Sequence, residues 1–189
     1  YYRYAHDGTL KNAVTSGLWR AESLTDVDGD KGLVFIKAVG REPGENLYYT
    51  HDYRVRLDGS DLKLLNPGDA NHSAAFGKTK NFLVDSCSRV DMPTRSCVYD
   101  DNGKELMVLE EMDLTRLKDM GWKMPETFTV KADDGFTDIY GNMWKPFDFD
   151  PKKKYPIILN VYPGPQTESV SASFSATSSN QQLAQVGFI

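Results

Sequence analysis

A strand–turn–strand pattern occurs three times in the first half of the chain. The stretch YRYAHDGTL (residues 2–10) recurs as YRVRLDGSDL (53–62) and, more weakly, as CVYDDNGKEL (97–106). Asp-Gly or Asn-Gly between alternating runs is a strong signal for a tight β-hairpin, because these residues tolerate the positive φ angles of primed turns. The pattern therefore predicts three hairpins with a glycine in each turn.

The spacing of these turns indicates how the hairpins are organised. Gly8, Gly59 and Gly103 are 51 and then 44 residues apart, close to the roughly 40 to 50 residues of one four-stranded propeller blade. Further strand candidates between them are residues 33–39, 46–50, 74–76 and 82–85. We expect a mainly β fold in which residues 1–108 form the last blades of a β-propeller. A small meander or sandwich with accidental repeats is the alternative.

About two and a half blades are present, whereas a propeller needs at least about four. We therefore expect the chain to be part of a longer protein, whose signal peptide or lipid anchor, if it has one, would lie upstream.

The strand–turn–strand pattern ends near residue 108. Residues 109–126 predict a connecting helix and linker, with the helix over Glu110–Gly121 and Gly121 as its C-terminal cap. Residues 127–189 read as the first strands of an α/β domain, beginning with two strands around the turn Asp133–Gly135. The run Tyr155–Tyr162 is nearly continuous in apolar residues, as expected for a strand buried on both faces. A helix is expected over 181–186, with Asn180 as its cap.

Composition narrows the function classes. The 189 residues carry 22 Lys and Arg against 27 Asp and Glu, a formal net charge of -5, and the one basic cluster is Lys152–Lys154. Such a chain lacks the cluster of positive charge that binding to a nucleic-acid backbone needs. No apolar run approaches the roughly 20 residues of a transmembrane helix. We therefore predict neither a nucleic-acid partner nor a membrane span in this chain.

Metal and cofactor sites are not predicted either. The acidic segment Asp26–Asp30 departs from calcium-loop spacing, because Gly29 precedes the third acid, so we interpret it as a solvated turn. Cys87 and Cys97 flank a predicted hairpin loop, and no zinc or redox spacing accompanies them. A disulfide between them is geometrically possible in an oxidising compartment, and two half-buried free thiols are the alternative.

The second half also carries a family resemblance. Lys153–Pro156, followed by the apolar run and Val161–Pro165 (Val-Tyr-Pro-Gly-Pro), resembles the start of the catalytic domain in the dipeptidyl peptidase IV branch of the prolyl oligopeptidase family. The propeller repeats and the connecting helix occur in the same order as in that family. Pro163 departs from the pattern, since many relatives carry a smaller residue there.

The resemblance implies a role for one residue of this chain. In the family, the tyrosine of this motif donates its hydroxyl to the developing oxyanion, and the matching residue here is Tyr162. Pro163 and Pro165 would restrict the backbone after it. Without the resemblance, a core or rim tyrosine bonded to a backbone carbonyl would be the simpler interpretation.

The other catalytic groups of the family are missing from this chain. Its serine nucleophile on a G-x-S-x-G elbow, and the Asp and His that follow, have no counterpart in the 189 residues. The chain's own histidines, His6, His51 and His72, all lie in the propeller-like half and are interpreted as surface or turn residues. Glu110 and Glu111 are not the glutamates with which the family holds a peptide's amino group.

The resemblance implies that this chain is a fragment of a serine exopeptidase that releases N-terminal Xaa-Pro or Xaa-Ala dipeptides. The chain alone would be inactive. The alternative is a non-catalytic propeller scaffold or binding module with a degenerate hydrolase-like domain. We expect a peptide substrate, a homodimeric longer protein, and a location in the periplasm or cell envelope.

Overall fold

The computed structural model describes residues 1–162 and 169–189. It divides into two compact units. The first unit comprises Tyr1–Cys87 and Arg95–Glu111, and the second comprises Ser88–Thr94 and Met112–Ile189. The three-part division at residues 108 and 126 stays a prediction, because compactness alone does not define domain limits.

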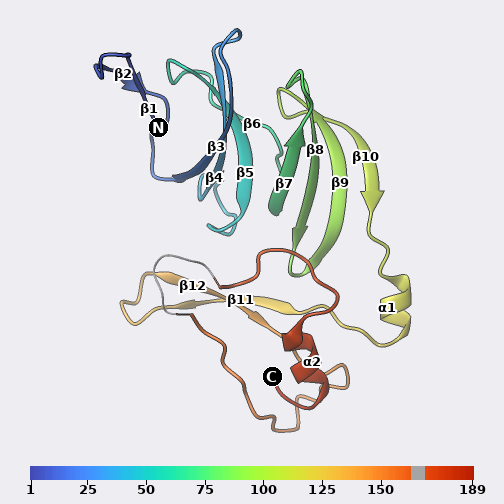
Figure 1. Cartoon of the computed structure of the whole chain (residues 1–189). Helices are drawn as coiled ribbons and strands as arrows, with labels where there is room; N and C mark the ends of the chain where they lie inside the picture. The colour runs from blue at the N-terminus through green and yellow to red at the C-terminus, as the bar shows by residue number, and fades with distance from the viewer. Residues whose placement is uncertain (163–168) are drawn as a thin grey trace. The chain divides into compact units, whose positions relative to one another are not determined.

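The first unit is built from antiparallel hairpins arranged as successive blades (Figure 1). Two strands form a small hairpin, β1 (Tyr2–Tyr4) and β2 (Leu10–Ala13). One four-stranded sheet contains, in chain order, β3 (Arg20–Asp28), β4 (Leu33–Val39), β5 (Thr50–Arg56) and β6 (Lys63–Leu64). The next contains β7 (Asn71–Phe76), β8 (Phe82–Arg89), β9 (Met92–Asp100) and β10 (Glu105–Glu111). This arrangement confirms the mainly β fold with propeller blades.

The three predicted hairpins are present, but their turn type differs from the prediction. Gly8, Gly59 and Gly103 have φ angles of +85°, +86° and +81°. The residue before each glycine is not among the described residues with positive φ. Each glycine is therefore the one left-handed residue of its tight turn, as in a three-residue loop built on a type I turn, and not one of the two adjacent left-handed residues that a primed turn requires. Asp61, two residues after Gly59, is also left-handed, with φ +54°.

The core of the first unit lies between adjacent sheets, because β4 is buried on both faces. Its alternating side chains follow the two-residue period of a strand. Val34, Ile36 and Ala38 pack in one cluster with Tyr53, whereas Phe35 packs in another with Leu83. Burying a side chain of this size contributes about 1.5 to 3 kcal/mol, so stacking of the blades supplies much of the stability of this unit.

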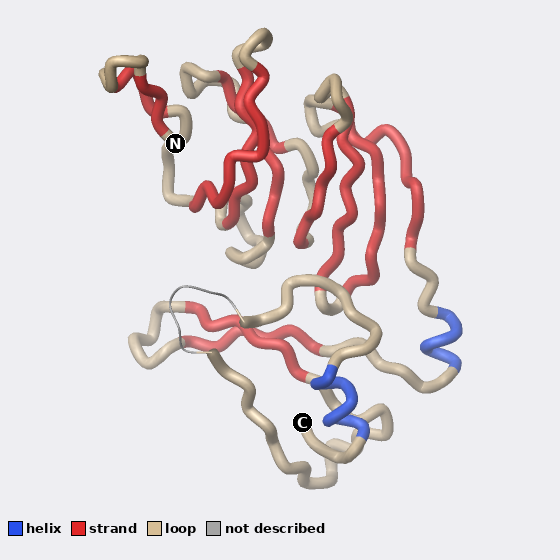
Figure 2. The backbone as a smooth tube through the Cα atoms, in the orientation of Figure 1, coloured by secondary structure: helices blue, strands red, loops and turns tan. Residues whose placement is uncertain are grey.

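The second unit has less regular structure (Figure 2). Its strands β11 (Glu126–Lys131) and β12 (Asp138–Met143) form the predicted hairpin. Its helices are α1 (Thr115–Asp119) and α2 (Ser179–Gln185). Trp122 is buried, packs edge-on against Phe174, and donates from Nε1 to the Ala176 carbonyl oxygen at 3.2 Å. This contact joins the end of α1 to the segment before α2.

Both helices begin at residues other than those predicted. α1 starts at Thr115, because Glu105–Glu111 pairs with β9 as the edge strand β10. Its end is as predicted: Gly121 has φ +83°, and its N–H bonds the Lys118 carbonyl. α2 is capped by Ser178, whose hydroxyl accepts from the Gln181 N–H at 3.0 Å, and not by Asn180.

Two strand predictions also need correction. Residues 46–50 are mostly turn, and β5 begins at Thr50. Asp26–Asp28 belong to β3, so only the end of the acidic segment is a turn.

Candidate functional site

Tyr162 ends the apolar run that begins at Tyr155. The run was predicted to be buried on both faces, but residues 156–162 are exposed and not assigned as a strand. The physical reason is that this run has little to pack against: within the described residues its backbone pairing is with Ile189 alone. Tyr162 is 50% exposed.

The pairing with Ile189 has the geometry of a parallel ladder. The Ile189 N–H donates to the Pro156 carbonyl at 3.0 Å, and the Ile158 N–H donates to the Ile189 carbonyl at 2.8 Å. In a parallel ladder, one residue bonds to the two residues that flank its partner. Ile189 does this with Pro156 and Ile158, which flank Ile157. Because α2 lies between the two paired segments, the order is strand-like run, helix, strand-like end. This is the basic unit of an α/β domain.

The start of the run is held by its aromatic neighbours. The Tyr155 hydroxyl oxygen accepts from the Asp150 N–H at 2.9 Å, and the Phe149 and Tyr155 ring centroids are 5.1 Å apart. Lys145 Nζ lies 4.9 Å from the centroid of Phe149. These contacts concern Tyr155, seven residues before Tyr162, and none of them reaches Tyr162 itself. Pro163, Gly164 and Pro165 lie outside the described residues.

Two histidines contradict the prediction of surface or turn positions. His6 is exposed in a hairpin turn, but His51 and His72 are each 2% exposed. His72 Nδ1 is 2.7 Å from Asp85 Oδ2, and both side chains are buried. Two charged partners at this distance offset the cost of burial that either would have alone.

The surroundings of His72 also bear on metal binding. His72, Asp85 and Cys87 place possible ligand atoms within 4.8 Å of one another. However, both ring nitrogens of His72 have hydrogen-bond acceptors, because Nε2 lies 2.9 Å from the Gly68 carbonyl oxygen. An imidazole that donates from both nitrogens has no lone pair for a metal. His72 and Asp85 are therefore already engaged with each other, and Cys87 lies beside them.

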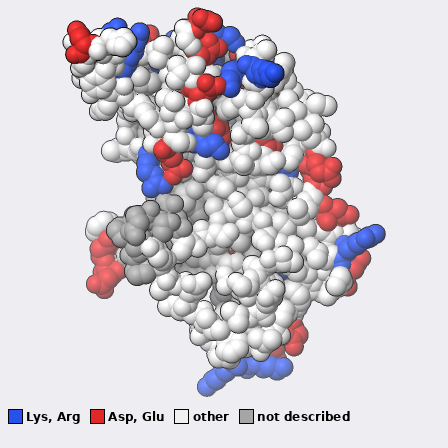
Figure 3. Space-filling view, in the orientation of Figure 1, with Lys and Arg blue, Asp and Glu red and all other residues white. Residues whose placement is uncertain are grey.

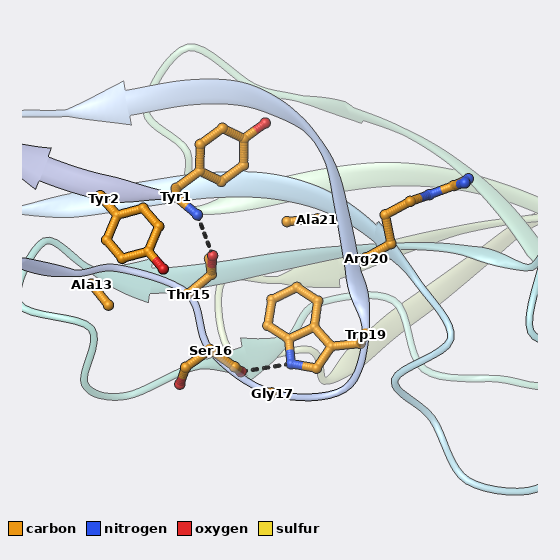
Figure 4. A pocket seen from close by; sticks show the side chains of 9 residues that line it. All are labelled: Tyr1, Tyr2, Ala13, Thr15, Ser16, Gly17, Trp19, Arg20 and Ala21. Atoms are coloured by element: carbon orange, nitrogen blue, oxygen red, sulfur yellow. Dashed lines mark hydrogen bonds between the residues drawn. The ribbon is translucent and has the colours of Figure 1, made fainter. Parts of the chain in front are cut away.

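A hollow of about 500 Å³ lies at the N-terminal end of the first unit (Figure 4). The Tyr1, Tyr2 and Trp19 rings line it, and Trp19 Nε1 donates to the Ser16 carbonyl oxygen at 2.8 Å. Its lining contains no carboxylate, histidine or cysteine. The hydroxyls of Thr15 and Ser16 therefore have no carboxylate or imidazole in this lining to activate them.

Charged groups of both signs are mixed on the face shown in Figure 3. Several form local pairs, such as Arg95 with Glu105 and Glu111 on the last blade. None of the helices in the described part of the chain has the length and apolar character to cross a bilayer.

Successive four-stranded blades followed by an α/β unit define a propeller–hydrolase class of protein. Residues 1–94 match the family model described as the dipeptidyl peptidase IV (DPP IV) N-terminal region. An Emericella nidulans protein named as a dipeptidyl-aminopeptidase B is 31% identical over 93% of this chain. Human dipeptidyl peptidase 8 is 28% identical over 94% of it. This chain spans 20% and 21% of those relatives.

Solved structures agree with the sequence comparisons. A crystal structure of a Bacteroides ovatus protein named as a dipeptidyl aminopeptidase IV matches the whole chain with a TM-score of 0.72 and 26% identity. The chain covers 27% of that structure. The family model, the relatives and the solved structure all support the dipeptidyl peptidase IV family for this chain.

Proposed function

We propose that this chain is part of a serine-type dipeptidyl peptidase that releases Xaa-Pro or Xaa-Ala dipeptides from peptide N-termini. The observation that carries the proposal is the position of Tyr162, half-exposed at the C-terminal end of the Tyr155–Tyr162 run. In α/β domains, ligands bind at the carboxyl ends of the strands. The names of the relatives support the reaction class.

In this proposal the Tyr162 phenol donates a hydrogen bond to the oxyanion that forms when a serine attacks the scissile carbonyl. A neutral donor aimed at developing charge stabilises the transition state more than the ground state. A backbone N–H beside the serine would be the second donor. The serine, aspartate and histidine would come from outside these 189 residues, so the chain alone is expected to be inactive.

Two further features of the whole protein belong to the same proposal. We infer that it is exported to the cell envelope and acts as a homodimer, as expected from the family resemblance. Neither inference is needed for the role of Tyr162.

The test uses the full-length protein that contains this chain. It should hydrolyse a Gly-Pro chromogenic anilide and be labelled by a serine-directed fluorophosphonate, whereas the 189-residue chain should do neither. A full-length protein that is well folded, unlabelled and inactive would instead be a propeller scaffold, and the proposal would be wrong.

A further inference from the structure

The connection between the two complete blades is held by buried polar groups. It runs from β6 to β7 through residues 65–70, in which Leu65, Asn66 and Ala70 are buried. The Leu65 N–H donates to the Asp52 carbonyl at 2.9 Å, and the Ala70 N–H donates to the Gly68 carbonyl at 2.8 Å. The first of these bonds ties the connection to β5, and the second lies within the connection.

Asn66 bridges two carboxylates on different blades. Its Nδ2 donates to Asp52 Oδ2 on β5 at 3.1 Å and to Asp85 Oδ1 on β8 at 3.0 Å. Its Oδ1 accepts from the Asp52 N–H at 2.8 Å. All three side chains are fully buried or nearly so. One amide thus joins the blades through two buried carboxyl groups, whose ionised forms need a nearby positive charge to offset the cost of burial.

His72 is the group placed to supply that charge. Its Nδ1 faces Asp85 and its Nε2 faces the Gly68 carbonyl. A carbonyl accepts but cannot donate, and the same holds for an ionised carboxylate, so both bonds form only when both ring nitrogens carry protons. The doubly protonated ring is an imidazolium. A neutral ring would leave one of these buried acceptors facing a lone pair.

Other ionisable groups surround the same site. On β5, the His51 ring centroid lies 4.6 Å from that of His72, and His51 Nε2 lies 2.8 Å from Glu45 Oε2. Asp52 interacts electrostatically with His72, and Lys37 of β4 interacts with Asp52. Cys87 of β8 lies within 4.8 Å of the His72 and Asp85 ligand atoms.

The balance of these effects favours the charged ring. Burial lowers the pKa of His72, but the hydrogen bond and charge of Asp85, with the Gly68 carbonyl, outweigh burial and leave the pKa raised above its ordinary value. A raised pKa in the folded state means that folding and protonation of His72 favour each other.

We infer that the His72 proton is a switch for the connection between the blades: residues 65–70 are clamped while the ring is an imidazolium and are released when it loses its proton. The contribution to stability is complete below about pH 6.5, the ordinary pKa of histidine. It declines as the pH rises through the higher pKa of the folded state. The first unit should therefore be less stable at mildly alkaline pH.

The first test measures the switch in the unmodified 189-residue chain. Amide hydrogen exchange of Leu65 and Ala70, corrected for intrinsic rates, should show protection that falls between pH 6 and pH 8.5. The Ile36 amide in the centre of β4 serves as an internal reference for global opening. Nitrogen NMR of the ring should show both His72 nitrogens protonated at pH 6.5.

The second test compares His72→Gln with His6→Gln, which alters an exposed histidine of the same chain. The unfolding constant of the unmodified chain and of His6→Gln should rise between pH 6 and pH 8.5 by about tenfold for each unit that the His72 pKa is raised. His72→Gln should lose this part of the pH dependence. His51, Asp52 and Cys87 remain in both variants, so the two chains differ only in which histidine is replaced.

Two results would overturn the switch. One is a singly protonated His72 at pH 6.5 in the folded chain, a measurement that needs no variant and so does not depend on whether His72→Gln folds. The other is a His72→Gln chain whose pH dependence equals that of His6→Gln. Neither outcome bears on peptidase activity, so the switch and the proposed function can fail separately.

Discussion

Gly103 lies directly against the backbone of Leu64: a Cβ atom at Gly103 would come within 2.3 Å of the Leu64 carbonyl oxygen. Gly59 has the same relationship with the preceding hairpin, where the distance to the Ala13 carbonyl oxygen would be 2.6 Å. Leu64 and Ala13 each end the last strand before the next blade begins. The repeat in the sequence is therefore also a repeat in how blades pack.

Replacing Gly103 with alanine should destabilise the first unit more than replacing Gly8. Both glycines have left-handed φ angles, which cost an alanine about 1 to 2 kcal/mol. Gly8 has open space around it, whereas Gly103 has backbone in the way. Overpacking of this kind adds about 1 to 3 kcal/mol. Urea unfolding of the two variants measures the difference, and equal losses would show that the blades do not pack as described.

Arg54 should be a second point of contact between blades. It is 8% exposed, its Nε donates to the Asp101 carbonyl at 2.6 Å, and its Nη2 donates to Asn102 Oδ1 at 3.1 Å. Arg54→Ala removes both hydrogen bonds from a buried charged donor and should reduce the free energy of unfolding by about 1 to 3 kcal/mol. Arg56→Ala, on the exposed end of the same strand, should change it by no more than about 0.5 kcal/mol. A similar loss in both variants would contradict a specific role for Arg54.

Cys87 and Cys97 should react slowly as thiols in the folded chain. Both are free and buried. Burial, together with the charge of Asp85, raises the pKa of the Cys87 thiol from 9.0 to about 11. At pH 8 the thiolate fraction of Cys87 should therefore be about a hundredfold lower than in the unfolded chain. Iodoacetamide labelling followed by mass spectrometry should modify both cysteines rapidly only in urea. No labelling in urea without reductant would reveal a disulfide.

The propeller could be predicted because its signals are local. Asp-Gly turns mark hairpins within a few residues, and the spacing of Gly8, Gly59 and Gly103 reflects the length of a blade. The turn type was wrong because it depends on the φ angle of the residue before glycine, which composition does not determine.

The buried polar cluster was missed because its contacts are not local. His72 and Asp85 are 13 residues apart and meet only because adjacent strands of one sheet hold them. The sequence did carry a signal, because alternate residues of a strand point to the same face. His72 is on the same face of β7 as Ala74 and Phe76, and Asp85 is on the same face of β8 as Leu83. Polar residues at inward positions of neighbouring strands predict a buried pair. The exposed Tyr155–Tyr162 run was misjudged because apolar composition alone does not provide the layers that would bury it.

The measurement that tests the central claim most directly is the effect of Tyr162→Phe on the kcat of the full-length protein with a Gly-Pro anilide. Loss of an oxyanion donor typically costs about 2.7 to 4 kcal/mol, so kcat should fall at least tenfold. Tyr155→Phe removes a hydroxyl from the same run, where its oxygen accepts from the Asp150 N–H, and should leave kcat nearly unchanged. Cleavage that is equally fast in the Tyr162→Phe variant would contradict the assignment of Tyr162 as an oxyanion donor.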